Sequence, residues 1–449
     1  MARRRAKPGT PRPWALAFFA LILHGPLAAQ PSDAEAPPQA AAWSLHAQLT
    51  YQLQGHGAID ASYEGQNSFQ DRKEVRGSYT TTFYLGRRLW KGAGLFVNAE
   101  FLAGQGVSQV VGLAGPPNGE TYRVDSTELK LGLARLYVRQ VLDLGGETEA
   151  VEDQANRLAG RESKRRIVLT AGKFSGTDIF DGNTYAHDPR TQFNNWSLWA
   201  NGAWDYPADT RGYTWGLALE WHHDDWHARL GSFMEPTEAN GIYFDHDVTH
   251  AHGEVIELEH EHRIGARSGS VRFLVFRNQA QMGIYRDALD ASPLAPDVTL
   301  TRSPDRTKYG FGLNAEQALT PDIGVFLRLG WNDGRTESWA FTEIEQTLAF
   351  GVSSAGRVWG RPADRLGIAL AVNGINGDHR DYLAAGGYGF MLGDGRLSYG
   401  AERVVDAYYS FAPVSFGSIS LEVQRYDNPA FNRDRGPVTV YGLRFHMEL

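Results

Sequence analysis

Tyr441-Gly442-Leu443-Arg444-Phe445-His446-Met447-Glu448-Leu449, the end of the chain, alternates apolar and polar side chains without a break. Side chains of a β-strand point alternately to opposite faces of the sheet, so this segment has one apolar and one polar face. A strand at the end of a chain has no following strand with which to form a hairpin. In a closed barrel it pairs with the first strand instead, and no edge is left.

The first strand candidate, residues 43–54, alternates in the same way, from Trp43 and Ser44 to Leu53 and Gln54. Further candidates lie at roughly 77–90, 94–104, 127–142, 166–173, 211–222, 225–233, 253–265, 269–278, 307–318, 322–332, 339–352, 364–375, 396–408, 416–425 and 437–449. About sixteen strands with one apolar face are typical of a bacterial outer-membrane barrel. We therefore expect an all-β, antiparallel transmembrane barrel over residues 43–449.

The N-terminus has the three-part pattern of a secretory signal peptide. Basic residues precede an apolar run from Trp14 to Leu23, and the small residues Ala28 and Ala29 follow. The run is too short to cross a bilayer as a helix. We expect a signal peptide over 1–29, a linker over 30–42, and export to the outer membrane of a Gram-negative bacterium, where lipid surrounds the barrel.

Charge and cysteine content exclude some classes of protein. Removal of residues 1–29 takes away five basic residues and leaves 39 Lys and Arg against 52 Asp and Glu, a balance of −13. So acidic a chain is poorly suited to nucleic acid, and we expect no such partner. The chain has no Cys, so no disulfide stabilises it.

The connections between strand candidates alternate in length, as the external loops and periplasmic turns of outer-membrane barrels do. Long links fall near 55–76, 105–126, 174–210, 234–252, 279–306 and 376–395. Short links include Lys91-Gly92-Ala93 and His223-Asp224. Residues 143–165 are long where a short turn is due, and residues 333–338 are short where a long loop is due. The pattern accounts for neither exception.

Residues 171–212 are long, polar and aromatic and do not alternate, which suits a segment that folds back and narrows the pore. They include Gly172-Lys173-Phe174, Ala186-His187-Asp188-Pro189-Arg190-Thr191-Gln192-Phe193-Asn194-Asn195 and Trp204-Asp205-Tyr206-Pro207. With Met282-Gly283-Ile284-Tyr285, Trp331-Asn332-Asp333-Gly334 and Gly386-Gly387-Tyr388-Gly389-Phe390, this segment resembles the carbohydrate-selective outer-membrane porins of the OprB type. The resemblance implies a sixteen-stranded barrel that passes sugars or polyols passively into the periplasm. Such barrels commonly end in Phe, which the barrel-assembly machinery reads, whereas this chain ends in Leu449.

Candidate solute contacts follow from strand parity and from the composition of the constricting segment. Arginine and carboxylate groups bond vicinal hydroxyls, and aromatic faces stack on pyranose rings. The candidates, which face the lumen by parity or lie in the constricting segment, are Arg135, Arg139, Asp188, Arg190, Asn194, Glu220, Arg229 and Arg328. Alternatively, the inward charges only solvate a wet lumen, and Asp188 and Arg190 form a local salt bridge that shapes the loop.

A cluster of histidines offers a competing metal site. His246, His250, His252, His260 and His262 lie among four glutamates. His260 and His262 share the parity of the lipid-facing Ile256 and Leu258, which favours an interfacial band, so we expect no metal and no cofactor. Motifs of serine hydrolases, zinc proteases and phosphate-binding loops are absent from the sequence, and we expect no enzyme. A surface enzyme or binding platform with a plugged lumen, a soluble periplasmic β-protein and a homo-oligomer are left open.

Overall fold

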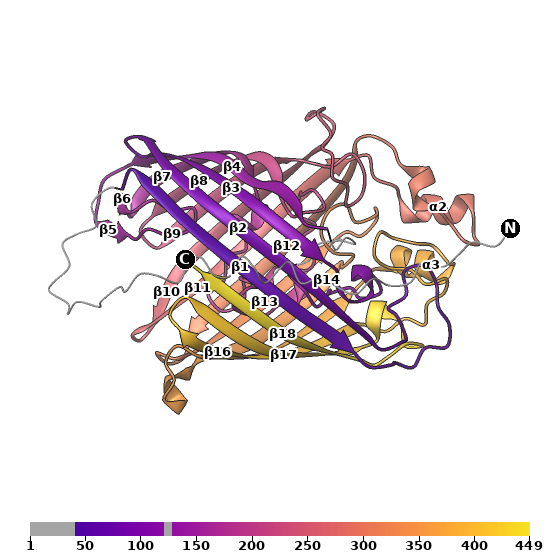
Figure 1. The fold of residues 1–449 in the computed structure, drawn as a ribbon. Coiled ribbons are helices and arrows are strands. Elements are labelled where there is room, and N and C mark those ends of the chain that lie inside the picture. Colours follow the sequence, from indigo (N-terminus) through magenta and orange to yellow (C-terminus); the bar gives the residue numbers. More distant parts are fainter. Residues whose placement is uncertain (1–40, 121–127) are drawn as a thin grey trace.

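The computed structural model describes residues 41–120 and 128–449 as a closed antiparallel barrel (Figure 1). The signal peptide expected over 1–29 and the linker up to residue 40 lie outside the described residues. Sixteen of the described strands form the barrel, which confirms the fold class. They are β1 (Trp43–His56), β2 (Glu74–Trp90), β3 (Ala93–Gly104), β4 (Lys130–Asp143), β7 (Arg165–Phe174), β8 (Thr214–His223), β9 (Trp226–Met234), β10 (His252–Ile264), β11 (Arg267–Ala280), β12 (Arg306–Ala318), β13 (Ile323–Asn332), β14 (Gln346–Ala355), β15 (Arg365–Gly374), β16 (Glu402–Val414), β17 (Gly417–Asp427) and β18 (Val438–Glu448).

The first and last strands close the barrel, as the alternation at both ends predicted. β1 pairs with β18 so that Gln48 lies opposite Glu448 and Tyr51 opposite Phe445. The N–H of Ala47 donates to the carbonyl of Leu449 at 2.9 Å, and the N–H of Leu449 donates to the carbonyl of Ala47 at 2.8 Å. The terminal residue is therefore part of the ladder, and no edge strand is left in the barrel.

The two faces of the barrel wall differ in chemistry. Side chains such as Leu217, 63 % exposed, and Phe350 cover the outside, whereas Arg444 points inward and is 1 % exposed. An apolar surface of this extent on a closed barrel faces lipid. Trp221 and Trp226 on the outer wall suit an aromatic girdle at the membrane boundary.

Long loops gather at one end of the barrel and short turns at the other. The long-loop end carries α2 (Tyr285–Ala291) and α3 (Gly377–Ala384), while β5 (Thr148–Val151) and β6 (Gly160–Ser163) lie at the opposite end (Figure 1). The remaining short elements are η2 (Val107–Val110), η3 (Gly176–Asp178), α1 (Trp196–Trp199), η4 (Val298–Thr301), η5 (Gly356–Trp359) and η6 (Pro429–Phe431). The helices of the described segments are all short, and none has the length and hydrophobicity of a membrane-crossing helix.

The largest differences from the expected strand starts are in β14 and β16. β14 starts at Gln346 rather than 339, and β16 starts at Glu402 rather than 396. The expected start of β14 was wrong because Trp339, Phe341 and Ile344 are buried among interior loops instead of forming part of the barrel wall. The loop after β13 therefore runs over 333–345, and the alternation of long and short links holds there. The long link over 143–165 contains the two-stranded β5–β6 hairpin.

Candidate functional site

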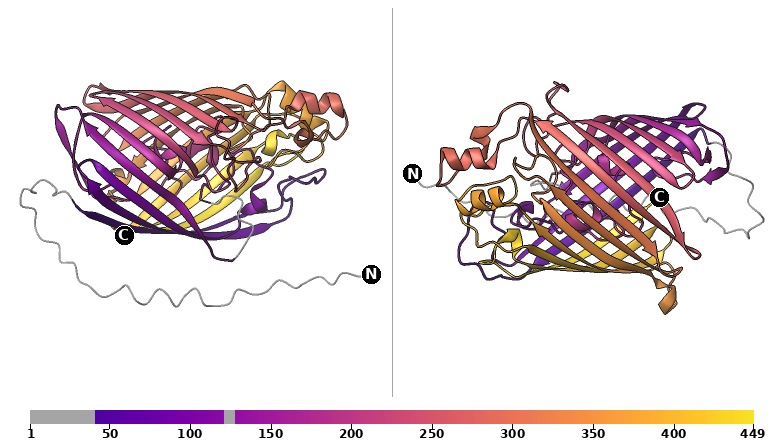
Figure 2. Two further views of the ribbon diagram at one scale, coloured as in Figure 1. Left: turned by 90° about the horizontal axis from the view of Figure 1, so that it is seen from above. Right: turned by 180° about the vertical axis from the view of Figure 1, so that it is seen from behind.

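Residues 175–213, which we call the lumen loop, connect β7 to β8 and run through the interior of the barrel. Chain segments inside the wall are visible between the strands in both views of Figure 2. The side chains of Phe180, Phe193, Leu198 and Trp204 in this loop are completely or almost completely buried. The segment that the sequence singled out as a pore constriction therefore does fold back into the lumen.

Arg328 of β13 fixes the lumen loop to one wall. Its Nη1 donates to the carbonyls of Ala186 and Leu198, each at 2.7 Å, and its Nε lies 3.1 Å from the Asp181 carboxylate. Arg328 and Asp181 are both buried. A buried guanidinium satisfied by a carboxylate and two carbonyls holds three points of the loop in one geometry.

Asp205 joins the lumen loop to the neighbouring loop, residues 333–345. Its carboxylate accepts hydrogen bonds from the N–H groups of Trp339, Ala340 and Phe341 at 2.7, 2.7 and 3.0 Å. Lys308 of β12 donates to the same carboxylate at 3.1 Å and is itself buried. The two loops therefore form one body attached to β12.

A second part of the wall holds the loop through β17 and β18. Arg444 donates to the carbonyls of Pro189 and Gln192 at 2.6 and 2.9 Å. The N–H of Asn194 donates to Glu422 at 3.2 Å, and its side-chain oxygen accepts from the N–H of Gly119 at 2.7 Å. With anchors on β12, β13, β17 and β18, the lumen loop spans the bore rather than lining one side of it.

A cavity of about 260 Å³ remains between the lumen loop and the wall around β4, and we call it the eyelet cavity. Its lining combines aromatic rings with ion pairs and includes Glu120, Arg135, Asp178, Asp188, Arg190, Trp196, Trp199, Tyr206, Tyr213 and Phe341. The rings of Trp196 and Phe341 stack with centroids 5.4 Å apart and planes 5° apart. Such a lining offers flat apolar faces beside hydrogen-bonding groups.

Two arginines of the eyelet cavity are each held against a carboxylate. Arg135 makes a bidentate contact with Asp178 at 2.7 and 2.6 Å. Arg190 donates to Glu120 at 2.9 Å and to the Tyr84 hydroxyl at 2.8 Å. These pairs present donors and acceptors to the cavity while their net charge cancels.

Burial and neighbouring charges act in opposite directions on Asp188 and Arg190. Burial alone raises the pKa of Asp188, but the Arg190 guanidinium and hydrogen bonds from the Thr191 hydroxyl and the Arg190 N–H outweigh it, so the pKa lies below its ordinary value. Burial lowers the pKa of Arg190, but Glu120 and other acidic groups raise it well above the ordinary range. Both groups are therefore charged at neutral pH.

The eight residues singled out from the sequence fall into three places. Arg135, Asp188 and Arg190 line the eyelet cavity. Arg328 and Asn194 are buried, where they hold the lumen loop.

The other three predicted residues, Arg139, Glu220 and Arg229, face the lumen nearer the short-turn end of the barrel. Arg229 pairs with Glu257 at 2.7 Å, with Glu259 at 2.6 Å and with Glu220 at 3.6 Å. Arg139 pairs with Glu162 at 2.7 Å. These residues continue the paired charges of the eyelet cavity along the bore.

Phe341 was missed as a lining residue of the eyelet cavity because the alternation predicts one strand over residues 339–352. The sequence does contain a signal for its position. Phe341, Glu343 and Glu345 share the parity of Thr347 and Ala349, which face the lumen, and not that of the lipid-facing Leu348 and Phe350. In the structure Glu343 and Glu345 are buried among loops.

The histidines that suggested a metal site do not converge. His250 pairs with Asp305 at 2.7 Å, His252 pairs with Glu254 at 2.8 Å, and the His260 ring stacks on Trp226 at 4.3 Å. Within residues 41–120 and 128–449, no three His, Asp or Glu side chains are grouped so that they could hold a metal ion.

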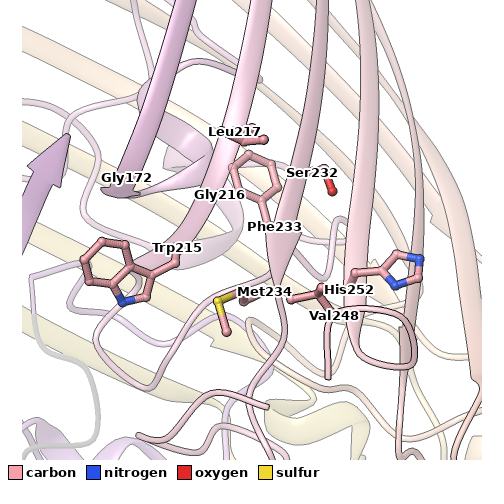
Figure 3. A pocket seen from close by; sticks show the side chains of 9 residues that line it. All are labelled: Gly172, Trp215, Gly216, Leu217, Ser232, Phe233, Met234, Val248 and His252. Atoms are coloured by element: carbon pink, nitrogen blue, oxygen red, sulfur yellow. The ribbon is translucent and has the colours of Figure 1, made fainter. Parts of the chain in front are cut away.

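A second hollow, of about 400 Å³, opens on the outer wall near the long-loop ends of β8 and β9 (Figure 3). Trp215, Leu217 and Met234 line it and have the outward parity of these strands. The hollow lies on the apolar exterior and not in the bore, so it is no part of the solute route.

Comparisons with known proteins agree with this geometry. Residues 67–449 match the family described as carbohydrate-selective porin, OprB family. The fold is similar to that of Pseudomonas putida OprB, with a TM-score of 0.66 and 15 % identity over 91 % of this chain and 94 % of that one. The outer membrane channel DcaP of Acinetobacter baumannii gives a TM-score of 0.51 at 10 % identity over 91 % of this chain and 97 % of that one. A search of curated protein sequences found no match. The match over 67–449 includes the lumen loop and fifteen of the barrel strands in whole, and the chain belongs to the OprB family of carbohydrate-selective porins.

Proposed function

We propose that carbohydrates cross this porin through the eyelet cavity, where they contact Arg135, Asp188 and Arg190 and the faces of the aromatic rings. As a member of its family, the protein is a passive outer-membrane channel for sugars. The observation that carries the proposal is the pairing of Arg135 and Arg190 with carboxylates beside stacked aromatic side chains.

The chemistry of the eyelet cavity suits uncharged polyols. Arg135 with Asp178, and Arg190 with Glu120, supply donors and acceptors side by side, which matches vicinal hydroxyl groups. Because each pair is close to neutral, the cavity has little net field with which to concentrate ions of either sign. Trp196, which is only partly buried and stacks on Phe341 with one face, offers its other face to the apolar side of a pyranose ring. Contacts of this kind are weak and multiple, which lets a solute enter and leave quickly.

We assign the remaining residues to supporting roles. Arg328 and Asn194 hold the lumen loop in position and do not touch the solute. Arg139, Glu220 and Arg229 line the route between the eyelet cavity and the short-turn end, which is the periplasmic end by the usual orientation of such barrels.

The cellular setting follows from the same proposal. A signal peptide over 1–29 exports the chain, and the apolar outer face contacts the lipid of a Gram-negative outer membrane. The barrel-assembly machinery inserts the barrel, and the outer wall is open to contact between copies. The protein acts as a channel and not as an enzyme. A surface enzyme or binding platform is not favoured, since the eyelet cavity is open and the family consists of porins.

Reconstitution into liposomes tests the function. We expect uncharged monosaccharides to enter faster than salts or amino acids of similar size, measured by osmotic swelling. The variants Arg190→Ala and Trp196→Ala are expected to lower the sugar rate relative to the salt rate, because each removes one class of contact. Arg403→Ala, an exposed position at the outer end of β16, is the matched control and should leave both rates unchanged. Faster entry of salts than of uncharged sugars in the wild-type protein would contradict the proposal.

A further inference from the structure

The link between β4 and β7 closes over the short-turn mouth of the barrel instead of turning back at once. Within it, β5 pairs with β6 so that Thr148 lies opposite Ser163 and Val151 opposite Gly160. The connecting residues 152–159 reach across the mouth to the first strands. Arg88 of β2 donates to the carbonyl of Ala159 at 2.8 Å. The hairpin is therefore tied to β2, which is separated from β4 by β3 in the order of pairing, and not only to the strands that it connects.

Further contacts fix the same segment from the side of β1. The Ser44 hydroxyl donates to the carbonyl of Gln154 at 3.4 Å, and His46 lies 3.3 Å from the Asp153 carboxylate. Ser44 and His46 have the inward parity of β1, opposite to the outward Trp43 and Leu45. Contacts with inward side chains place residues 153–154 inside the rim of the bore.

The hairpin also buries apolar side chains against the interior of the wall. Val151 and Ala159 are buried. Leu158 packs against the cluster that contains Phe96 and Tyr137, two inward residues of β3 and β4. A turn that stayed in the periplasm would leave these apolar side chains in water, which is unfavourable. The packing favours a hairpin that stays in the mouth.

One hairpin carboxylate reaches the charged lining of the bore. Glu162 of β6 accepts hydrogen bonds from Arg139 at 2.7 and 3.3 Å and lies 3.4 Å from Arg166 and 3.9 Å from Arg157. Its side chain is 12 % exposed and that of Arg139 is 24 % exposed, so solvent and small solutes reach both. Glu162 is thus the carboxylate that three guanidinium groups share, and one of them, Arg166, also lies 3.3 Å from Glu149.

We propose that the β5–β6 hairpin forms a second constriction of the channel, in which Arg139 and Glu162 make the last contacts with a carbohydrate as it leaves for the periplasm. The inference rests on the proposed sugar transport. The Arg139–Glu162 pair has the same chemistry as the Arg135–Asp178 pair of the eyelet cavity. Two weak sites in series allow a solute to pass from one to the next without tight binding at either.

Shortening the hairpin tests the constriction. In the variant, a short Gly/Ser turn replaces residues 148–163, and heat-modifiable migration in electrophoresis verifies that the barrel is folded. We expect the single-channel conductance to rise by about twofold, since narrow segments in series resist ion flow additively. Swelling rates of trisaccharides are expected to rise more than those of monosaccharides. An unchanged conductance in a folded variant would overturn the proposal.

Glu162→Gln tests the role of the carboxylate without removing the hairpin. The change leaves Arg139, Arg157 and Arg166 without their shared anion, so the reversal potential in a salt gradient should shift toward anion selectivity. Glu147→Gln, on the outer side of the hairpin with its side chain 76 % exposed, removes the same charge and should give no shift. Equal reversal potentials for wild type and Glu162→Gln would exclude Glu162 from the ion and solute path. The conductance and the reversal potential test the second constriction independently of sugar transport. A wild-type protein without sugar preference would contradict only the proposed function.

Discussion

Arg328 illustrates how a residue with lumen-facing parity can hold the constriction instead of touching the solute. The sequence showed only that it faces inward. The structure adds that the lumen loop covers it, so all three of its side-chain nitrogens donate to Asp181, Ala186 or Leu198. Parity reports the side of the wall on which a side chain lies. It does not report what lies on top of that side chain.

Replacement of Arg328 should therefore loosen the loop. Arg328→Ala leaves Asp181 buried without its cation, which typically costs about 3–5 kcal/mol. We expect lower stability in urea unfolding monitored by tryptophan fluorescence, together with larger and noisier single-channel currents. Arg403→Ala, which removes an exposed arginine from the outer wall, serves as the control for loss of charge alone. A quiet channel with wild-type conductance would show that the other anchors are sufficient.

The pH dependence of the eyelet cavity follows from Asp188. Its pKa is lower in the folded protein than in the unfolded chain, so its contribution to stability is complete above the ordinary aspartate pKa of about 3.9 and is lost as the pH falls through the lowered value. We expect the conductance and sugar preference to be constant from neutral pH down to about pH 4.5 and to change only in stronger acid. Asp188→Asn removes the carboxylate that titrates, so it should reduce the change of conductance and sugar preference in strong acid. A midpoint near pH 6 would point to a histidine instead.

At the scale of elements, alternation located the strands well where one face meets lipid and the other meets the lumen. It failed where apolar side chains alternate for another reason. Trp339 and Phe341 share the lumen-facing parity of β14 but lie before the strand begins, where Trp339 packs against Met282 and Phe341 packs on the lumen loop. Likewise, no local pattern indicated that residues 143–165 contain a hairpin. The contacts of this segment with Ser44 and Arg88 join parts of the chain that are far apart in sequence.

Asp205 couples two of these interior elements, and its removal should loosen both. Asp205→Asn takes away the charge that faces buried Lys308 and weakens acceptance of the N–H groups of Trp339, Ala340 and Phe341. The expected loss of stability is about 1–3 kcal/mol. Limited proteolysis should then cut within 333–345 faster than in the wild type. The double variant Asp205→Asn/Lys308→Met removes the unpaired cation and should regain part of the loss. Additive effects of the two substitutions would mean that the pair is not coupled.

For the whole molecule, the bore is polar, and arginines contact carboxylates from the eyelet cavity to the periplasmic mouth. Arg135 with Asp178, Arg229 with Glu257, and Arg139 with Glu162 follow one another along the wall. The sequence predicted a wet lumen and an apolar exterior, since these depend on every second residue of each strand. It did not predict which charges meet, because the partners come from loops whose course no periodicity describes.

Closure of the barrel depends on the stretch at the very end of the chain. β18 pairs with β17 on one side and β1 on the other, and Ala47 and Leu449 exchange backbone hydrogen bonds. Deletion of residues 438–449 should leave two unpaired edges and remove Arg444, an anchor of the lumen loop. We expect no heat-modifiable barrel and no conductance from the truncated chain refolded in detergent. Arg444→Ala should close the barrel but loosen the loop, which separates the two losses. A truncated chain that still formed a conducting barrel would show that β17 can pair directly with β1, and the closing strand would then be dispensable.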